Sequence, residues 1–228
     1  MGGVLRRARC DGRLAAGAVF LAGSAGPLPA HLTASYPPDD LAVIQVTGAG
    51  HLVPARFADS SQLQAGDIVL AMGNPLGLAS SVTDGIVSAV GRTVPEPPEG
   101  GKPGATLPDV IQTSAAINPG NSGVPLADLA DQVVGIPTMA ATDQQLGGAA
   151  PGIGFAIPSN IVTDIAGQII KTGHVTNSHR AALGVNVQTV TGPDGQPAGA
   201  GIAAVTPGGP AAKVGLQPAD VMDGGCRS

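Results

Sequence analysis

Residues 111–126 read I-Q-T-S-A-A-I-N-P-G-N-S-G-V-P-L, and this stretch determines how the rest of the chain is interpreted. An apolar run leads into a tight turn at Pro119-Gly120, and a second apolar run starts at Val124. Ser122 stands between two glycines at the apex, where it has little side-chain cover and can face a cleft. Gly120 lacks a Cβ, so it can adopt angles that aim its N–H and that of Ser122 at one point. A hydroxyl beside two converging donors offers the nucleophile and oxyanion hole of an acyl-transfer site.

An ordinary turn that contains a serine is the alternative, because turns rich in Asn, Pro, Gly and Ser are common. Four further stretches give the acyl-transfer interpretation more weight. They are D-D-L-A-V-I from Asp39, Q-A-G-D-I-V-L-A-M-G-N-P-L-G from Gln64, V-T-D-G-I-V-S-A from Val82 and G-I-G-F-A-I-P-S from Gly152. In this order, and together with A-I-N-P-G-N-S-G-V-P-L, they resemble the HtrA/DegP-like branch of the chymotrypsin-fold serine proteases over about residues 32–175.

The resemblance implies an all-β fold, a chymotrypsin/trypsin-like double β-barrel whose first barrel is incomplete, followed by a partial PDZ domain. Residues 1–31 are expected to be an atypical N-terminal segment, residues 32–177 the protease domain, and residues 178–228 the partial PDZ domain. Composition agrees with an all-β chain, since 35 glycines and 21 prolines fall between short β-branched runs. Aromatic residues make up only 2% of the chain, so the core must be built from Val, Ile, Leu and Ala.

The family match assigns catalytic roles residue by residue. Ser122 matches the nucleophile, the backbone of Gly120, Asn121 and Ser122 matches the oxyanion hole, and Asp40 matches the triad aspartate that orients the histidine. On spacing alone, an acidic cap before a strand is the preferred interpretation of Asp40, and the D-L-A-V context reverses this preference in favour of the catalytic role. Asp39 falls one residue short of the match.

A triad also needs a histidine, and the sequence offers four. His31 precedes Asp40 by far less than the family spacing, and His51 follows it. His174 and His179 lie beyond the nucleophile, in a helix end and a linker. The sequence therefore predicts an incomplete triad.

Residues 1–30 combine a basic start with an apolar stretch from Leu14 to Leu28, which has the form of a secretory signal. The apolar stretch is short and rich in glycine for a membrane span. Extending the family match backwards places the first strands and the catalytic histidine here, and neither pattern is present. A missing, replaced or mistranslated family N-terminus is the favoured interpretation.

The remaining stretches predict individual elements. Leu41–Val46 is expected to be a strand buried on both faces, and residues 92–108 an irregular loop. Ala140–Pro151 reads as a loop. Residues 158–173 form the clearest helix, with Ser159 as its N-cap and Gly173 as its C-terminal stop.

Two binding regions follow from the resemblance. The strand with Ile153, Gly154 and Phe155 is expected to line the pocket for the residue before the cut bond, and to prefer small or medium apolar side chains. Leu183-Gly184-Val185 matches the PDZ loop that holds a peptide C-terminus.

By resemblance the chain is a serine endopeptidase of protein quality control that acts on unfolded or damaged polypeptides. It is expected to be inactive because the histidine is not found. A non-catalytic peptide-binding pseudoprotease and a gene fragment without function of its own are the alternatives. Two positions depart from the family pattern, since Val124 stands where Gly is usual and Ser114 where Asp is usual.

Partners and surroundings are also implied. The family suggests a homotrimer, peptide C-termini as ligands of a completed PDZ domain, and a bacterial extracytoplasmic or membrane-associated location. No cofactor and no metal site is implied. Cys10 and Cys226 show no metal-ligand spacing. A net charge of −5 argues against nucleic acid as a partner.

Overall fold

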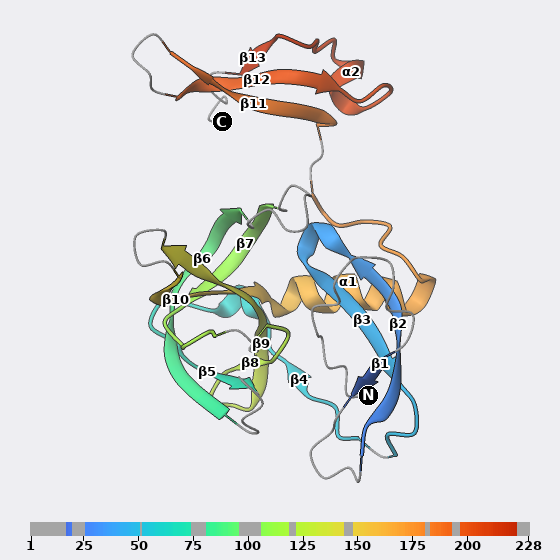
Figure 1. Ribbon diagram of the computed structural model, residues 1–228, viewed down its shortest axis with the longest axis vertical. Coiled ribbons are helices and arrows are strands. Elements are labelled where there is room, and N and C mark those ends of the chain that lie inside the picture. Colours follow the sequence, from blue (N-terminus) through green and yellow to red (C-terminus); the bar gives the residue numbers. More distant parts are fainter. Residues whose placement is uncertain are drawn as a thin grey trace. The chain divides into compact units, whose positions relative to one another are not determined.

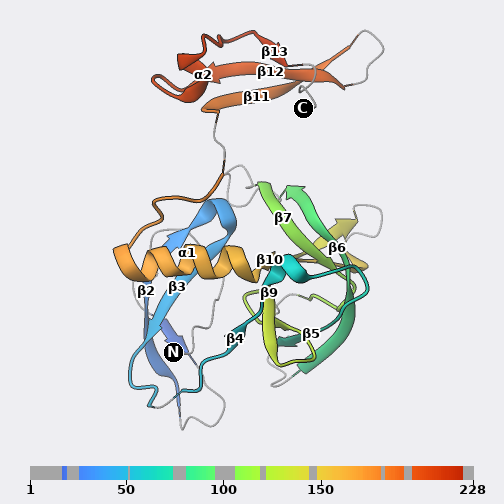
Figure 2. The same ribbon diagram turned by 180° about the vertical axis from the view of Figure 1, so that it is seen from behind.

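The computed structural model is shown in Figures 1 and 2. It describes residues 17–19, 26–50, 52–73, 81–95, 106–118, 122–143, 148–180, 183–192 and 197–222. The chain divides into two compact units, Met1–Thr176 and Asn177–Ser228, and each is described by itself. Within the described residues, no helix is both long and apolar enough to span a bilayer.

The first unit begins with a small antiparallel sheet in the order β1-β2-β3. Its strands are β1 (Gly17–Val19), β2 (Leu28–Tyr36) and β3 (Leu41–Val46). A 3₁₀ turn, η1 (Pro37–Asp39), joins β2 to β3, and proline suits its start because the ring fixes φ. The expectation that β3 is buried on both faces is wrong, since Leu41 alone is fully buried and the next three residues are half-buried. The reason is that α1 covers only one face of this small sheet.

The second sheet has the order β10-β7-β6-β5-β8-β9-β4, and β10 also pairs with β9. Its strands are β4 (Arg56–Phe57), β5 (Ile68–Gly73), β6 (Ser81–Pro95), β7 (Thr106–Thr113), β8 (Leu126–Ala127), β9 (Gln132–Asp143) and β10 (Gly148–Pro158). The β10–β9 pairing closes the strands from β5 to β10 into a barrel, and β4 joins β9 in parallel at its outside. Closure leaves these strands without open edges.

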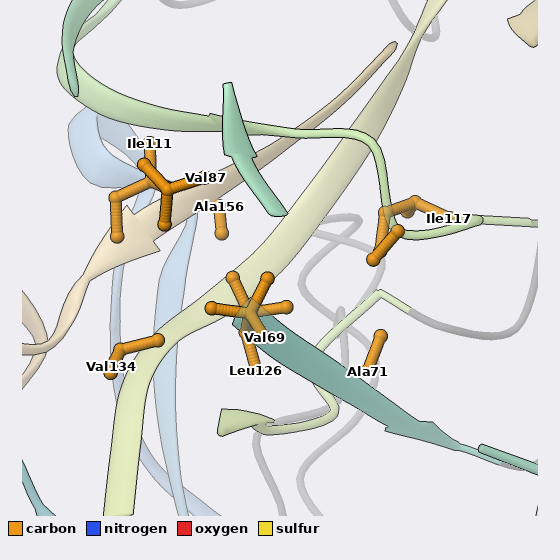
Figure 3. Close-up of a cluster of buried hydrophobic side chains, with 9 residues drawn as sticks. Val69, Ala71, Val87, Ile111, Ile117, Leu126, Val134 and Ala156 are labelled. Carbon is orange, nitrogen blue, oxygen red and sulfur yellow. The ribbon is translucent and has the colours of Figure 1, made fainter. Parts of the chain in front are cut away.

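Aliphatic side chains fill the barrel, as the scarcity of aromatic residues requires. Figure 3 shows Val69, Leu126 and Val134 pointing inward from β5, β8 and β9, and all three are at most 1% exposed. Gly135 lies within this packing, where a Cβ would stand 2.8 Å from the carbonyl oxygen of Ile157. The barrel core therefore depends on tight contacts between small and branched residues.

A single long helix, α1 (Ser159–Thr172), ends the first unit, and Figure 2 shows it in front of β2 and β3. Its apolar stripe of Val162, Ile165 and Ile169 packs with Leu41. Gly173 ends the helix in the left-handed conformation (φ 80°), as predicted.

The prediction that Ser159 is the N-cap of α1 is wrong. Pro158 occupies the cap position, and Ser159 is the first helical residue, fully buried. Its hydroxyl donates to the carbonyl of Ala58 (2.7 Å), just before the 3₁₀ turn η2 (Ser60–Gln62). The hydroxyl thus fastens the helix to a neighbouring segment instead of capping its own N–H groups.

Two predicted loops are shorter than expected. In residues 92–108, β6 continues to Pro95 and β7 already starts at Thr106. In Ala140–Pro151, β9 runs to Asp143 and β10 starts at Gly148. Antiparallel pairing overrides the loop-like composition in both places, because each strand continues along a partner.

The second unit holds a three-stranded antiparallel sheet in the order β11-β12-β13, with a short helix. Its elements are β11 (Val185–Thr191), β12 (Pro197–Val205), α2 (Pro210–Lys213) and β13 (Val221–Met222). Among the described residues of this unit, Ile202 and Ala211 are the buried hydrophobic ones.

Candidate active site

The turn that carries Ser122 is bound to strand β9. The N–H of Gly123 donates to the carbonyl of Pro137 (2.8 Å), and the Ser122 hydroxyl donates to the carbonyl of Thr138 (2.7 Å). Gly123 has a φ of 82°, which glycine adopts without steric cost. Ser122 is half-buried, and its hydroxyl proton is engaged by β9, which differs from the expected hydroxyl facing a cleft. Gly120 and Asn121, predicted to form the oxyanion hole with Ser122, lie outside the described residues.

Thr138 links the predicted nucleophile to the predicted aspartate. It is only 3% exposed, and its hydroxyl donates to Oδ2 of Asp40 (2.5 Å), while its carbonyl accepts from Ser122. One residue of β9 therefore contacts both Ser122 and Asp40, so the fold brings together two groups that are distant in the sequence.

Asp40 is placed by the turn between β2 and β3. Its N–H donates to the carbonyl of Pro37 (3.1 Å), and its backbone is left-handed (φ 51°, ψ 35°). Aspartate is one of the residues that tolerate this conformation. Asp39, the neighbouring candidate, is a buried residue of η1 at 5% exposure.

The structure describes three of the four histidines. On β2, His31 is exposed, and its Nε2 lies 3.1 Å from the side-chain oxygen of Gln45 on β3. His174 follows α1 and places its Nδ1 3.0 Å from the carbonyl oxygen of Thr172. His179 belongs to the second unit, and His51 lies outside the described residues. These contacts hold His31 and His174 at places other than the Ser122 hydroxyl.

The predicted substrate-pocket residues divide between two faces of β10. Gly154 faces Ile117, since a Cβ on Gly154 would stand 2.4 Å from the Cγ1 atom of Ile117. Phe155 belongs to a separate core cluster with Leu107 and Val110. Ile153 is 37% exposed. Their role in binding substrate stays a prediction.

The two departures from the family pattern have local explanations. The left-handed backbone near the nucleophile falls on Gly123 and not on Val124, so the branched side chain of Val124 sits on ordinary backbone. The Ser114 hydroxyl accepts from the N–H of Ile86 (3.0 Å). Next to it, Gly85 allows a close approach, because a Cβ there would stand 2.2 Å from the backbone N of Ala115.

Sequence reasoning missed Thr138 as a site residue. Its signal was a single hydroxyl-bearing residue in the apolar strand G-I-P-T-M-A, where a buried threonine must find a hydrogen-bond partner. That the partner is Asp40 depends on the fold.

In the second unit, the predicted peptide-binding loop is tied to the turn before α2 and to α2 itself. The carbonyl of Leu183 accepts from the N–H of Ala211 (2.9 Å), and that of Gly184 accepts from the N–H of Thr206 (2.7 Å). Gly184 has a φ of 72°, and Val185 starts β11 opposite Val205.

The described part of the chain contains no group of acidic, histidine or cysteine side chains able to hold a metal ion.

Comparison with known proteins finds one matching family and several related serine proteases. The model of the trypsin-like peptidase domain matches residues 6–136. A probable periplasmic serine endoprotease, DegP-like, of Pseudomonas putida (strain F1) is 42% identical over 202 residues, which is 86% of this chain and 39% of that protein. The serine protease PepD of Mycobacterium tuberculosis (strain H37Rv) is 42% identical over 194 residues, 82% of this chain and 40% of that protein. The chain therefore spans about two-fifths of the length of these relatives.

Among solved structures, the HtrA-type protease AlgW with decapeptide is similar with a TM-score of 0.64 and 39% sequence identity. The match covers 85% of this chain and 57% of that one.

Proposed function

Because the chain belongs to the HtrA/DegP-like serine proteases of the trypsin fold, we propose that it binds unfolded or damaged polypeptides at Ser122 but hydrolyses them at a negligible rate. The observation that carries this proposal is Thr138, whose two oxygens bind Ser122 and Asp40. A solved relative that is described with a decapeptide supports a polypeptide as the ligand.

Each site residue has a role in the proposed chemistry. Ser122 would attack the scissile carbonyl, and the N–H groups of Gly120 and Ser122 would hold the oxyanion. Asp40, fixed by the Thr138 hydroxyl, would orient an imidazole and stabilise its protonated form. For the attack, the Ser122 hydroxyl must first exchange its bond to the Thr138 carbonyl for a bond to a base.

The low rate is inferred from the histidines. Of the four in the chain, His31 and His174 contact other groups, and His51 and His179 follow Asp40 in the sequence, whereas the histidine of the family precedes the aspartate. A serine hydroxyl without a base is a poor nucleophile at neutral pH. Binding and the oxyanion hole alone give about 10³–10⁴-fold over water.

The test measures binding and cleavage of an unfolded casein-like protein by the purified chain and by the Ser122→Ala variant. We expect both proteins to bind the substrate and neither to cleave it above background. Cleavage that disappears in Ser122→Ala would contradict the low rate and establish an active protease. Absence of binding would contradict the proposal as a whole.

A non-catalytic peptide-binding role is the second candidate, and the bond from the Ser122 hydroxyl to the Thr138 carbonyl favours it. The family resemblance further supports two proposals about partners. One is a homotrimer, and the other is the binding of peptide C-termini at Leu183-Gly184-Val185 when a complete PDZ domain is present.

A further inference from the structure

A groove that reaches the packed interior of the barrel is not used by the proposed chemistry. It encloses about 430 Å³ between the β8–β9 turn, the start of β5 and the η2 turn. Val134 lies at its base, buried at 1% exposure, and Ile68 and Leu129 line it with 51% and 69% of their surfaces exposed. Two large aliphatic side chains therefore stay in contact with water around a concave surface.

The charges of this groove all have one sign. Asp59, Asp67 and Asp128 line it, and none of the described lysine and arginine residues does. Among the described residues, no group of three or more acidic, histidine or cysteine side chains is placed to hold a metal ion. Cationic groups on a ligand would therefore complement these carboxylates.

Hydrogen bonds hold the carboxylates of Asp67 and Asp128 in place, and each carboxylate can still accept a further hydrogen bond. Asp128 accepts the N–H groups of Ala130 and Gln132 through Oδ1 (both 2.9 Å), and Asp67 accepts the N–H of Gln64 through Oδ2 (2.8 Å). In the part of the chain that the structure describes, the other oxygen of each of these two carboxylates accepts no hydrogen bond. Each can accept one from a ligand without disturbing its turn.

We propose that this groove is a docking site for extended polypeptide segments in which lysine or arginine alternates with aliphatic residues. The apolar stem of a lysine or arginine side chain would lie on Ile68 and Leu129, and its charged head would reach the carboxylates. Side chains alternate between the two sides of an extended chain, so the cationic residues would lie on one side of the bound segment and the aliphatic residues on the other. A second copy that presented the same face would bring like charges together, which is unfavourable.

The inference rests on the proposed function, because it takes polypeptide as the ligand and makes the groove a second contact for substrate. It concerns a different place, since none of Ser122, Thr138 and Asp40 lines the groove. The two proposals can therefore fail separately.

The experiment measures fluorescence polarisation of a short labelled peptide of alternating lysine and leucine, added to the full chain carrying Ser122→Ala. Asp67→Asn with Asp128→Asn removes two charges but keeps the oxygens that accept the turn N–H groups. This double variant should weaken binding about three- to tenfold at low salt, since exposed ion pairs contribute about 0.2–1 kcal/mol each. Leu129→Ser should also weaken binding, and a glutamate–leucine peptide should not bind.

Asp84→Asn is the matched control, because it removes one charge from the exposed face of β6 outside the groove. It should leave the affinity within about twofold, as expected for a distant and screened charge. Equal losses in this control and in the groove variants would overturn the docking site. Binding that is lost in Thr138→Val but unchanged in the groove variants would overturn it too, and would leave the proposed function standing. Sedimentation that shows an oligomer dissociated by Leu129→Ser, without peptide binding, would assign the groove to contacts between copies instead.

Discussion

Strands β9 and β11 each contain five β-branched residues but have very different surroundings. β9 pairs with β8 on one side and β10 on the other, and its residues from Val133 to Thr138 are all buried. β11 is richer in β-branched residues, yet among the described strands it pairs only with β12, and its residues are half-buried or exposed throughout. Closure of the barrel makes the difference, because it gives each strand two partners and an enclosed face. The site residue Thr138 lies on the enclosed strand, where it is only 3% exposed.

The largest effect should come from a cavity in the closed barrel. Leu126 is fully buried, so Leu126→Ala should lower the free energy of unfolding of the first unit by about 3 kcal/mol. Val187 on β11 is 52% exposed, so Val187→Ala should change the stability of the second unit by less than about 1 kcal/mol. Urea unfolding followed by circular dichroism, with hydrogen exchange to separate the units, measures both. Similar losses would mean that the two sheets are not as different as their burial indicates.

The next effect concerns the bond between Thr138 and Asp40. Thr138→Val keeps the shape but removes the donor to a carboxylate, which should cost about 1–2 kcal/mol of unfolding free energy. Thr138→Ser restores the donor and should recover most of the loss. If the Thr138→Val and Thr138→Ser variants had equal free energies of unfolding, the hydrogen bond to Asp40 would contribute nothing to stability. The link between Ser122 and Asp40 would then consist of packing alone.

The sequence predicted much of this arrangement where pattern and local geometry coincide. The resemblance to the HtrA/DegP-like trypsin fold is confirmed by the family model, the relatives and the solved structures. The helix ending at Gly173 was also predicted, because an apolar stripe followed by glycine is a local signal.

Other features could not be predicted because they depend on contacts between distant segments. Ser159 looked like a helix cap, but its hydroxyl bonds to Ala58, which the sequence does not place nearby. The strand ends at Asp143 and Gly148 lie in loop-like sequence and are strand only because they pair with each other. Thr138 was overlooked for the same reason, since only the fold brings Asp40 to its hydroxyl.

A smaller effect is expected where the second unit carries backbone strain. Ala219 has a φ of 80°, a conformation that costs a residue with a Cβ roughly 1–2 kcal/mol. Ala219→Gly should stabilise the second unit by about 1 kcal/mol, after glycine's greater freedom in the unfolded chain is subtracted. The amide of Ile202, which donates to the carbonyl of Asp220 (2.8 Å), should exchange its hydrogen more slowly in the variant. Ala211→Gly, in α2, should act in the opposite direction, and a faster exchange in Ala219→Gly would rule out strain at this turn.

The smallest effect is a pH dependence at the joint between η2 and α1. A hydrogen bond from the Asn160 side chain, and then bonds from Ser61, lower the pKa of Asp59 from 3.8 to about 2. Because the folded pKa lies below the unfolded value, the ionised carboxylate stabilises the first unit above pH 3.8, and this contribution disappears as the pH falls through about 2. Asp59→Asn keeps an acceptor for Asn160 (2.7 Å in the parent chain) but cannot titrate, so the stability difference between parent and variant should shrink between those two pH values. Urea unfolding in steps from pH 5 to pH 2 measures this difference, and Asp84→Asn provides the control for loss of an exposed charge. A difference that stays constant over the range would show that Asp59 is not held by Asn160 in solution, and that η2 and α1 are joined by the remaining hydrogen bonds, those between Ser60 and Asn160 and that of the Ser159 hydroxyl.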